Sequence, residues 1–242
     1  MIPAEALIES MDRNGIDRSV VFGFPWRSDR LLRRHNEYVI ESAGRFPDRL
    51  IPLACLDLFA ENIIELATGY VNAVSGFGEL AVYSGSQNTD LALANFRTVA
   101  SLCREKGRIL LVHANEPVGH IYPGKAPFGL DLYYSMAEAA AGIPLILAHW
   151  GGGLFFYELL KKEASERLAN VYYDTAASLF LYKSDIYKIA ALTAGSGKIL
   201  FGSDFPLISP ERYFAEVAQS GLTEFEVSAL FGGNAARILS LE

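Results

Sequence analysis

The feature that most constrains the fold is a regular alternation of short apolar runs with longer amphipathic segments. A strand buried on both faces of a parallel sheet has a continuous apolar run of this kind, because both of its sides meet apolar neighbours. We therefore expect strands at residues 19–24, 50–56, 76–82, 108–114, 144–149, 170–174 and 198–201.

Helical periodicity fills the intervals between these runs. In the first segment Leu7, Ile8 and Met11 share one face, and Gly15 follows as a stop signal. The expected helices cover residues 3–14, 31–44, 61–74, 91–106, 130–141, 155–168, 184–194, 210–219, 223–230 and 233–239. Strands that alternate with helices predict βαβ units and a parallel sheet. With no linker composition, residues 1–242 are expected to form a single α/β domain, a TIM-like (β/α) barrel.

The expected barrel shows seven strands, and its usual first strand is missing. The chain opens with helix 3–14, which in a barrel would follow a strand. An open barrel exposes two strand edges and apolar surface, and such edges pair readily with other chains. We therefore expect a homo-oligomer.

Charge and cysteine content exclude several classes of partner. The net charge of −7 includes no basic run, so neither nucleic acid nor an anionic membrane is an expected partner. The uncharged stretch 139–157 contains a proline and four glycines, which argues against a membrane span. Cys55 and Cys103 form no CxxC pair and are expected as buried, reduced thiols of a cytoplasmic protein.

Ionisable side chains stand at the ends of five expected strands, namely Glu79, His113, His149, Asp174 and Asp204. The carboxyl ends of parallel barrel strands meet on one face, where such enzymes carry their active sites. An ionisable group in an apolar run must be paired, hydrogen-bonded or metal-bound. Imidazole and carboxylate together suit zinc or another divalent first-row metal. Asp174 is equally compatible with fixing a loop or orienting a histidine, and Asp204 with capping the next turn.

The loop after His113 places several polar side chains above this face. Glu116, His120, Tyr122 and Lys125 offer an acid, a base, a phenol and a cation, and loops at this end of a barrel carry specificity. We expect them, together with Trp150, to contact a small-molecule substrate. A solvated surface loop is the alternative.

Several segments together resemble the amidohydrolase-related metal-dependent hydrolases, the group that includes enzymes of the aminocarboxymuconate-semialdehyde decarboxylase type. They are Gly76-Phe77-Gly78-Glu79, Val112-His113, His149-Trp150-Gly151-Gly152-Gly153, Gly202-Ser203-Asp204-Phe205-Pro206 and Gly233-Asn234-Ala235-Ala236. The resemblance implies that His113, His149, Asp204 and Glu79 bind a divalent metal, zinc before manganese. It also implies that Asp204 takes a proton from the metal-bound water and that His149 orients and activates that water.

The chain departs from this family at one motif. Relatives open with a strand carrying His-x-His, whereas the histidines of this chain are His35, His113, His120 and His149. The missing motif would lie on the missing strand. A misassigned start, a truncation or a real loss of the strand would each account for both absences.

The resemblance favours hydrolysis of a small amide, ester or lactone by a metal-activated water. A non-oxidative decarboxylase of a small carboxylic acid on the same scaffold is the alternative. A non-catalytic member lacking the His-x-His strand is a third possibility.

Overall fold

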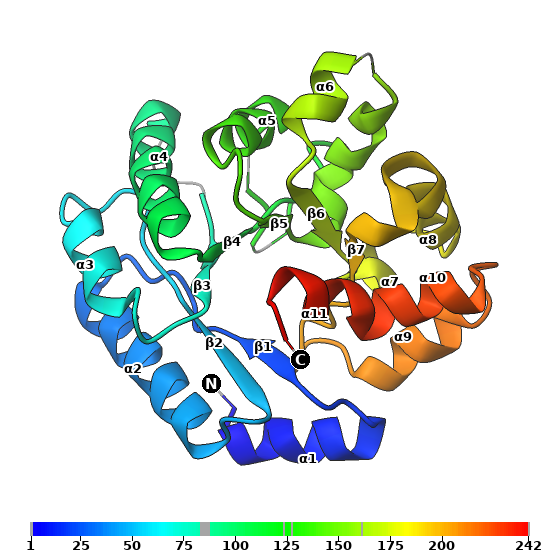
Figure 1. Ribbon diagram of the computed structural model, residues 1–242, viewed down its shortest axis with the longest axis horizontal. Helices are drawn as coiled ribbons and strands as arrows, with labels where there is room; N and C mark the ends of the chain where they lie inside the picture. Colours follow the sequence, from blue (N-terminus) through cyan, green and yellow to red (C-terminus); the bar gives the residue numbers. More distant parts are fainter. Residues whose placement is uncertain (1, 83–87, 123, 127, 161, 242) are drawn as a thin grey trace.

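Seven parallel strands form one curled sheet in the computed structural model, which describes residues 2–82, 88–122, 124–126, 128–160 and 162–241 (Figure 1). Their order in the sheet is their order in the chain. The strands are β1 (Ser19–Val21), β2 (Leu50–Ala54), β3 (Gly76–Leu80), β4 (Ile109–Val112), β5 (Leu145–Leu147), β6 (Val171–Asp174) and β7 (Ile199–Leu200). All seven expected strands are confirmed, each shorter than its apolar run.

Helices surround the outside of the curl (Figure 1). The α-helices are α1 (Ala4–Asn14), α2 (Asp29–Arg45), α3 (Ile63–Tyr70), α4 (Thr89–Lys106), α5 (Leu130–Ala139), α6 (Lys162–Arg167), α7 (Ser178–Leu181), α8 (Asp185–Ala190), α9 (Pro210–Val217), α10 (Glu224–Ser228) and α11 (Asn234–Ile238). Four tighter or wider helical segments complete them: η1 (His149–Leu159), η2 (Ala191–Gly195), η3 (Ser196–Lys198) and η4 (Ala229–Gly233).

One predicted helix is divided in the structure, and one short helix was not predicted. The expected helix at 155–168 is divided, because η1 ends where Leu160 takes an extended backbone with φ −69° and ψ 166°. The second half of that segment is the separate helix α6. The four-residue helix α7 was missed, since one turn is too short to show a helical period. None of the described helices combines the length and apolar character that a membrane span needs.

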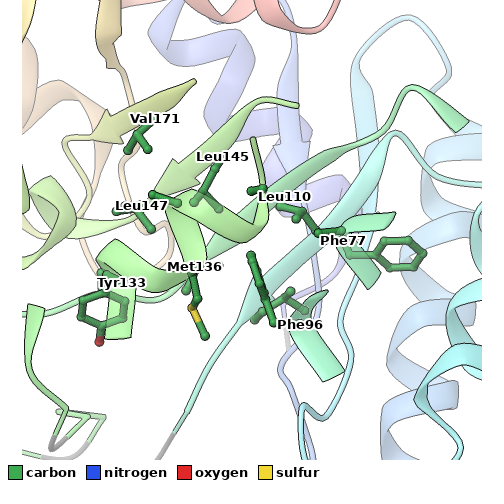
Figure 2. Packing of buried hydrophobic residues seen from close by; sticks show 14 of the residues in the cluster. Phe77, Phe96, Leu110, Tyr133, Met136, Leu145, Leu147 and Val171 are labelled. Atoms are coloured by element: carbon green, nitrogen blue, oxygen red, sulfur yellow. The ribbon is translucent and has the colours of Figure 1, made fainter. Parts of the chain in front are cut away.

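The sheet separates two apolar clusters of different size. The large outer cluster joins strand residues such as Phe77, Leu110 and Leu147 to Phe96 of α4 and Met136 of α5 (Figure 2). The smaller inner cluster contains Leu53, Ile109, Leu111, Ile146, Ala148 and Leu200, and Ala235, Ile238 and Leu239 of the C-terminal segment pack against it. Successive residues of one strand face the two clusters in turn, as the two-residue period of a strand requires. It directs residues such as His113, two positions after Leu111, toward the interior.

The barrel is open between its first and last strands. Among the described residues, β1 pairs only with β2 and β7 only with β6. This gap lies where the sequence analysis found the usual first strand to be missing. Association of the open edges with a second copy stays a prediction. Both cysteines are buried and unpaired, as expected.

A register shift in β3 turns Glu79 toward the interior. Phe77 and Leu80 both belong to the outer cluster, so two residues lie between successive outward positions. The pairing with β4 shifts at the same place. Such bulges re-aim side chains next to active sites. Gly78 allows the close approach that this requires, because a Cβ atom there would lie 2.5 Å from Cβ of Leu111.

The tight packing of β3 on β4 predicts a strong effect of one added methyl group. In Gly76→Ala the new Cβ would lie 2.2 Å from the Ile109 carbonyl oxygen, so the two strands must separate. We expect the free energy of unfolding to fall by about 1–3 kcal/mol, as measured by urea denaturation. Gly44→Ala in α2 is the control. Its Cβ meets no atom within 4 Å, and it should leave stability unchanged or raise it by up to about 1 kcal/mol. Equal midpoints for the two variants would contradict this packing.

Candidate metal centre

Three potential ligand atoms form a compact triangle at the carboxyl ends of β3, β4 and β5. Nδ1 of His113 lies 3.1 Å from Oε1 of Glu79. Nε2 of His149 lies 3.3 Å from the same His113 nitrogen and 3.7 Å from the same Glu79 oxygen. Both histidines are buried, and Glu79 is 17% exposed. The three distances therefore connect one carboxylate oxygen and two ring nitrogens, one atom from each residue.

The triangle has the size of one face of a metal coordination sphere. In a tetrahedral zinc site with ligands at about 2.0–2.1 Å, neighbouring ligand atoms lie roughly 3.3 Å apart. The three measured edges bracket that separation. Two imidazoles and one carboxylate are also a donor set that first-row divalent metals accept. The residues present therefore fit a single divalent metal ion.

Backbone carbonyl groups fix which ring nitrogens face the centre of the triangle. Nε2 of His113 donates to the carbonyl oxygen of Gly124 at 3.0 Å, and Nδ1 of His149 donates to that of Ala176 at 3.0 Å. A carbonyl oxygen only accepts, so each of these nitrogens carries the proton. In the neutral rings the lone pairs then lie on the two nitrogens of the triangle. Metal-binding histidines in proteins commonly show this arrangement.

Asp174 holds the backbone of both residues that form the hydrogen bond between His149 and the Ala176 carbonyl. Its Oδ1 accepts from the backbone N–H groups of His149 and Ala176, at 3.0 Å each. The same carboxylate oxygen thus fixes His149 and the residue whose carbonyl orients its ring. The structure supports both roles that the sequence left open for Asp174, because the carboxylate fixes the loop at Ala176 and the carbonyl of Ala176 orients the His149 ring.

An unusual left-handed turn delivers the His149 side chain. Residues 149–153 all have positive φ, from 55° at His149 to 95° at Gly153. Glycine adopts this conformation at no steric cost, whereas His149 and Trp150 do so only when the surroundings enforce it. Gly152 permits the turn to touch the neighbouring loop, because a Cβ atom there would lie 2.3 Å from the Asn115 carbonyl oxygen. The glycines after His149 therefore serve to place the imidazole.

Electrostatics in the triangle favour an ion pair when no metal is bound. Burial alone would raise the pKa of Glu79, but His113 and His149 hold it below its ordinary value. Burial likewise lowers the pKa of His113, yet the Glu79 carboxylate, the Gly124 carbonyl and Asp204 together raise it by more, so the net shift is upward. The lowered pKa of Glu79 and the raised pKa of His113 both favour a charged carboxylate beside a charged imidazolium. Burial raises the pKa of Asp174 to about 6 against the opposing influence of His149.

Asp204 lies beside the triangle and not in it. The cluster of ligand atoms within 4.8 Å of one another contains Glu79, His113 and His149, and the Asp204 carboxylate is not part of it. The residue is exposed, with a left-handed φ of 58°. Desolvation of its carboxyl group raises its pKa, and His149, Glu79 and His113 are close enough to act on it electrostatically.

The loop after β4 brings three of its four expected site residues together. Glu116 accepts from Lys125 at 2.9 Å through one carboxylate oxygen and from Tyr122 at 3.1 Å through the other. His120 is exposed, and its ring meets the edge of Tyr122. Trp150 lies apart from these residues. It is fully buried and donates to Oγ of Ser178 at 2.7 Å.

Two tyrosines that no sequence pattern singles out lie near this loop. Among the described residues, the hydroxyls of Tyr133 and Tyr182 are buried and have no hydrogen-bond partner. The same is true of the Ser42 hydroxyl. Burial raises the pKa of Tyr133 to about 12 against the opposing influence of the Asn115 backbone, and the charges of Glu79 and Glu116 add to the upward shift. Burial and the charge of Glu116 raise the pKa of Tyr182 to about 12. In Figure 2 the Tyr133 hydroxyl points away from the apolar side chains labelled beside it.

Comparison with known proteins gives one family and several similar folds. A profile of the family described as amidohydrolase matches residues 5–241. No curated protein matches the sequence.

Three of the similar solved structures represent the range of matches. A 2,6-dihydroxybenzoate decarboxylase from Rhizobium is 18% identical, with a TM-score of 0.75, and the alignment covers 100% of this chain and 89% of that one. A dihydroxybenzoic acid decarboxylase from Polaromonas with bound manganese is 17% identical, with a TM-score of 0.70 and coverage of 100% and 87%. An amidohydrolase from Burkholderia multivorans with bound zinc is 17% identical, with a TM-score of 0.70 and coverage of 100% and 89%. At this level of identity the likeness concerns the fold.

The ion pair in the triangle predicts how His113 titrates in the metal-free protein. Since Glu79 is the main group that raises the pKa of His113, Glu79→Gln leaves burial to dominate, and the pKa should fall. NMR titration of the ring signals measures this directly. Glu158→Gln, which also removes a buried ion-paired carboxylate, should leave the His113 pKa unchanged. An unshifted pKa in Glu79→Gln would contradict the geometry of the triangle.

Proposed function

The chain belongs to the amidohydrolase family, and from this membership we propose that it is a metal-dependent enzyme that decarboxylates a small carboxylic acid without oxidation. The observation that carries the proposal is the triangle of Glu79 Oε1, His113 Nδ1 and His149 Nε2. These three residues would hold one divalent metal. Similar structures contain manganese or zinc, which makes these two metals the first to test.

The similar structures favour decarboxylation over the hydrolysis that the sequence ranked first. They include decarboxylases of 2,6-dihydroxybenzoate and of 5-carboxyvanillate. A bound metal would supply the positive charge that polarises a substrate oxygen. The remaining requirement is a proton donor, because the departing carboxylate must be replaced by hydrogen.

Asp204 is the residue that suits this role. Its carboxyl group lies close enough to the triangle to interact electrostatically with all three of its members, and its raised pKa favours the protonated form that can donate. As the C–C bond breaks, its electron pair remains on the substrate carbon, carbon dioxide leaves, and Asp204 donates a proton to that carbon. Because the residue is exposed, water can return the proton.

Hydrolysis is the second candidate, and the solvent contact of Asp204 favours it. In its ionised form the same carboxylate can accept a proton from an attacking water. His149 cannot act as this base while both of its nitrogens are engaged, one by the Ala176 carbonyl and the other in the triangle. Both reactions therefore place the proton transfer on Asp204.

The decarboxylase proposal predicts a specific defect in Asp204→Asn. The metal-loaded variant should retain its metal, since Asp204 lies outside the triangle, and should lose about 10²–10⁴-fold in kcat because the amide cannot donate the proton. The assay is release of carbon dioxide from a panel of hydroxybenzoates and other small acids. Asp12→Asn in α1, whose exposed carboxylate pairs with Arg49 away from the carboxyl ends of the strands, is the control and should retain activity.

Two other outcomes would contradict the proposal. Unimpaired release of carbon dioxide by Asp204→Asn would remove Asp204 from the mechanism. Turnover of amides, esters or lactones without carbon dioxide release from any acid would establish hydrolysis instead.

We further propose that the substrate is aromatic and carries an oxygen substituent besides its carboxylate. The unpaired hydroxyls of Tyr133 and Tyr182 support this, because a buried hydroxyl without a partner costs about 1–3 kcal/mol and a substrate oxygen would relieve that cost. Tyr133 lies within electrostatic reach of Glu79, which is itself part of the triangle.

Tyr133→Phe and Tyr182→Phe test the substrate assignment. Each should raise KM roughly fivefold, corresponding to about 1 kcal/mol for one hydrogen bond, with little change in kcat. Neither should lower stability, since the missing hydroxyl has no partner in the folded protein. Tyr187→Phe is the control, because its hydroxyl pairs with Glu216 at 3.0 Å, and its loss should lower stability and leave KM unchanged. An unchanged KM in both test variants would contradict the substrate assignment.

A further inference from the structure

Lys125 was expected to contact the substrate, but its ammonium group is already fully engaged. It donates to Oε1 of Glu116 at 2.9 Å, to the carbonyl oxygen of His120 at 3.2 Å and to the carbonyl oxygen of Val118. A lysine has three N–H donors and no more. Its side chain is also only 9% exposed. A substrate could use this cation only by breaking contacts within the loop.

These contacts close the loop at its base. Beside the Glu116–Lys125 ion pair, the Asn115 side chain accepts from the backbone N–H of Ala126 at 2.7 Å and donates to its carbonyl oxygen at 3.1 Å. Two successive residues after β4 are thus tied to two successive residues at the far end of the loop. Asn115 is fully buried, so these bonds are shielded from water.

The carbonyl that orients His113 lies within this closed segment. Gly124 directly precedes Lys125, and its carbonyl oxygen accepts the hydrogen bond from Nε2 of His113. Gly124 has a φ of 93°, which is suited to glycine and sets the direction of that carbonyl. The path from the ion pair to the ring nitrogen therefore crosses one peptide unit.

We propose that the Glu116–Lys125 ion pair is a positioning device for His113. It holds the Gly124 carbonyl where this group accepts from Nε2, and so presents Nδ1 to the metal. The proposal rests on the metal-binding part of the proposed function. It makes Lys125 and Glu116 positioning residues that do not contact the substrate.

The main test compares Lys125→Met with Lys198→Met. Lys198 also pairs with a buried carboxylate, Glu158, at 2.6 Å, and bonds the Leu168 carbonyl, but it ends η3 directly before β7. The two substitutions therefore remove similar interactions at opposite ends of the sheet. Zinc affinity, measured by competition with a chromophoric chelator, should fall about ten- to a hundredfold in Lys125→Met and stay at the wild-type value in Lys198→Met.

A second readout needs neither metal nor activity. In ¹⁵N NMR spectra of the metal-free protein at a pH where the ring is neutral, His113 should be protonated at Nε2 in the wild type and in Lys198→Met. In Lys125→Met it should populate both tautomers. Because this signal comes from the metal-free chain, it distinguishes failure of the positioning proposal from failure of the proposed enzyme function.

Two further variants keep the proposal testable if Lys125→Met folds poorly. Lys125→Arg retains the charge and offers donors to the same acceptors, so it should recover most of the zinc affinity. Gly124→Ala leaves Lys125 intact but disfavours the backbone conformation that directs the carbonyl, and it should reproduce the loss. Gly142→Ala is its control, since Gly142 has a similar φ of 86° outside the loop and its Cβ would meet no atom within 4 Å.

A different pattern would overturn the proposal. If Lys125 binds substrate, Lys125→Met will raise KM while zinc affinity and the His113 tautomer remain those of the wild type. Unchanged zinc affinity and an unchanged tautomer, with or without a change in KM, would show that the ion pair does not position His113.

Discussion

The candidate metal centre depends on the hydrogen bonds that two backbone carbonyls accept from the outer ring nitrogens of His113 and His149. Each bond places the proton on the nitrogen that points away from Glu79. In the neutral rings the lone pairs then converge on one point, and the three potential ligand atoms can act together. Without these bonds either tautomer of each ring would be accessible, and the triangle would be a chance approach of polar groups.

The fold places His149 and the Ala176 carbonyl at a local cost in backbone strain. His149, Trp150, Ala177 and Asp204 all have positive φ, and all four lie in the segments that follow β5, β6 and β7. Strained backbone of this kind persists only where the surrounding structure enforces it, and it concentrates at functional sites. Here the enforcing groups are visible. The Asp174 carboxylate holds His149 and Ala176, and the buried Trp150 ring is anchored on Ser178.

The sequence predicted the strands and the ionisable residues at their ends, because both depend on local pattern. A continuous apolar run predicts a buried strand, and the residue that ends it must lie at the rim of the sheet. It could not predict that Glu79 turns inward, since this depends on a register shift between β3 and β4. Nor could it show that the Asp204 carboxylate lies outside the triangle, because this depends on where the segment after β7 lies in the folded chain.

The loop after β4 illustrates the same limit. Its residue types suggested a substrate site, and the sequence held nothing to show that Glu116 and Lys125 pair with each other. Tyr133 and Tyr182 escaped notice because a tyrosine in an apolar segment resembles any other core residue. Only the packed structure shows that their hydroxyls have no partner.

X-ray absorption spectroscopy of the protein loaded with one equivalent of zinc tests whether Glu79, His113 and His149 together bind a metal. We expect a tightly bound ion with nitrogen and oxygen neighbours at about 2.0–2.1 Å and the outer-shell scattering of two imidazole rings. Zinc that is not retained, or that shows no imidazole scattering, would contradict the assignment of Glu79, His113 and His149 as a metal centre.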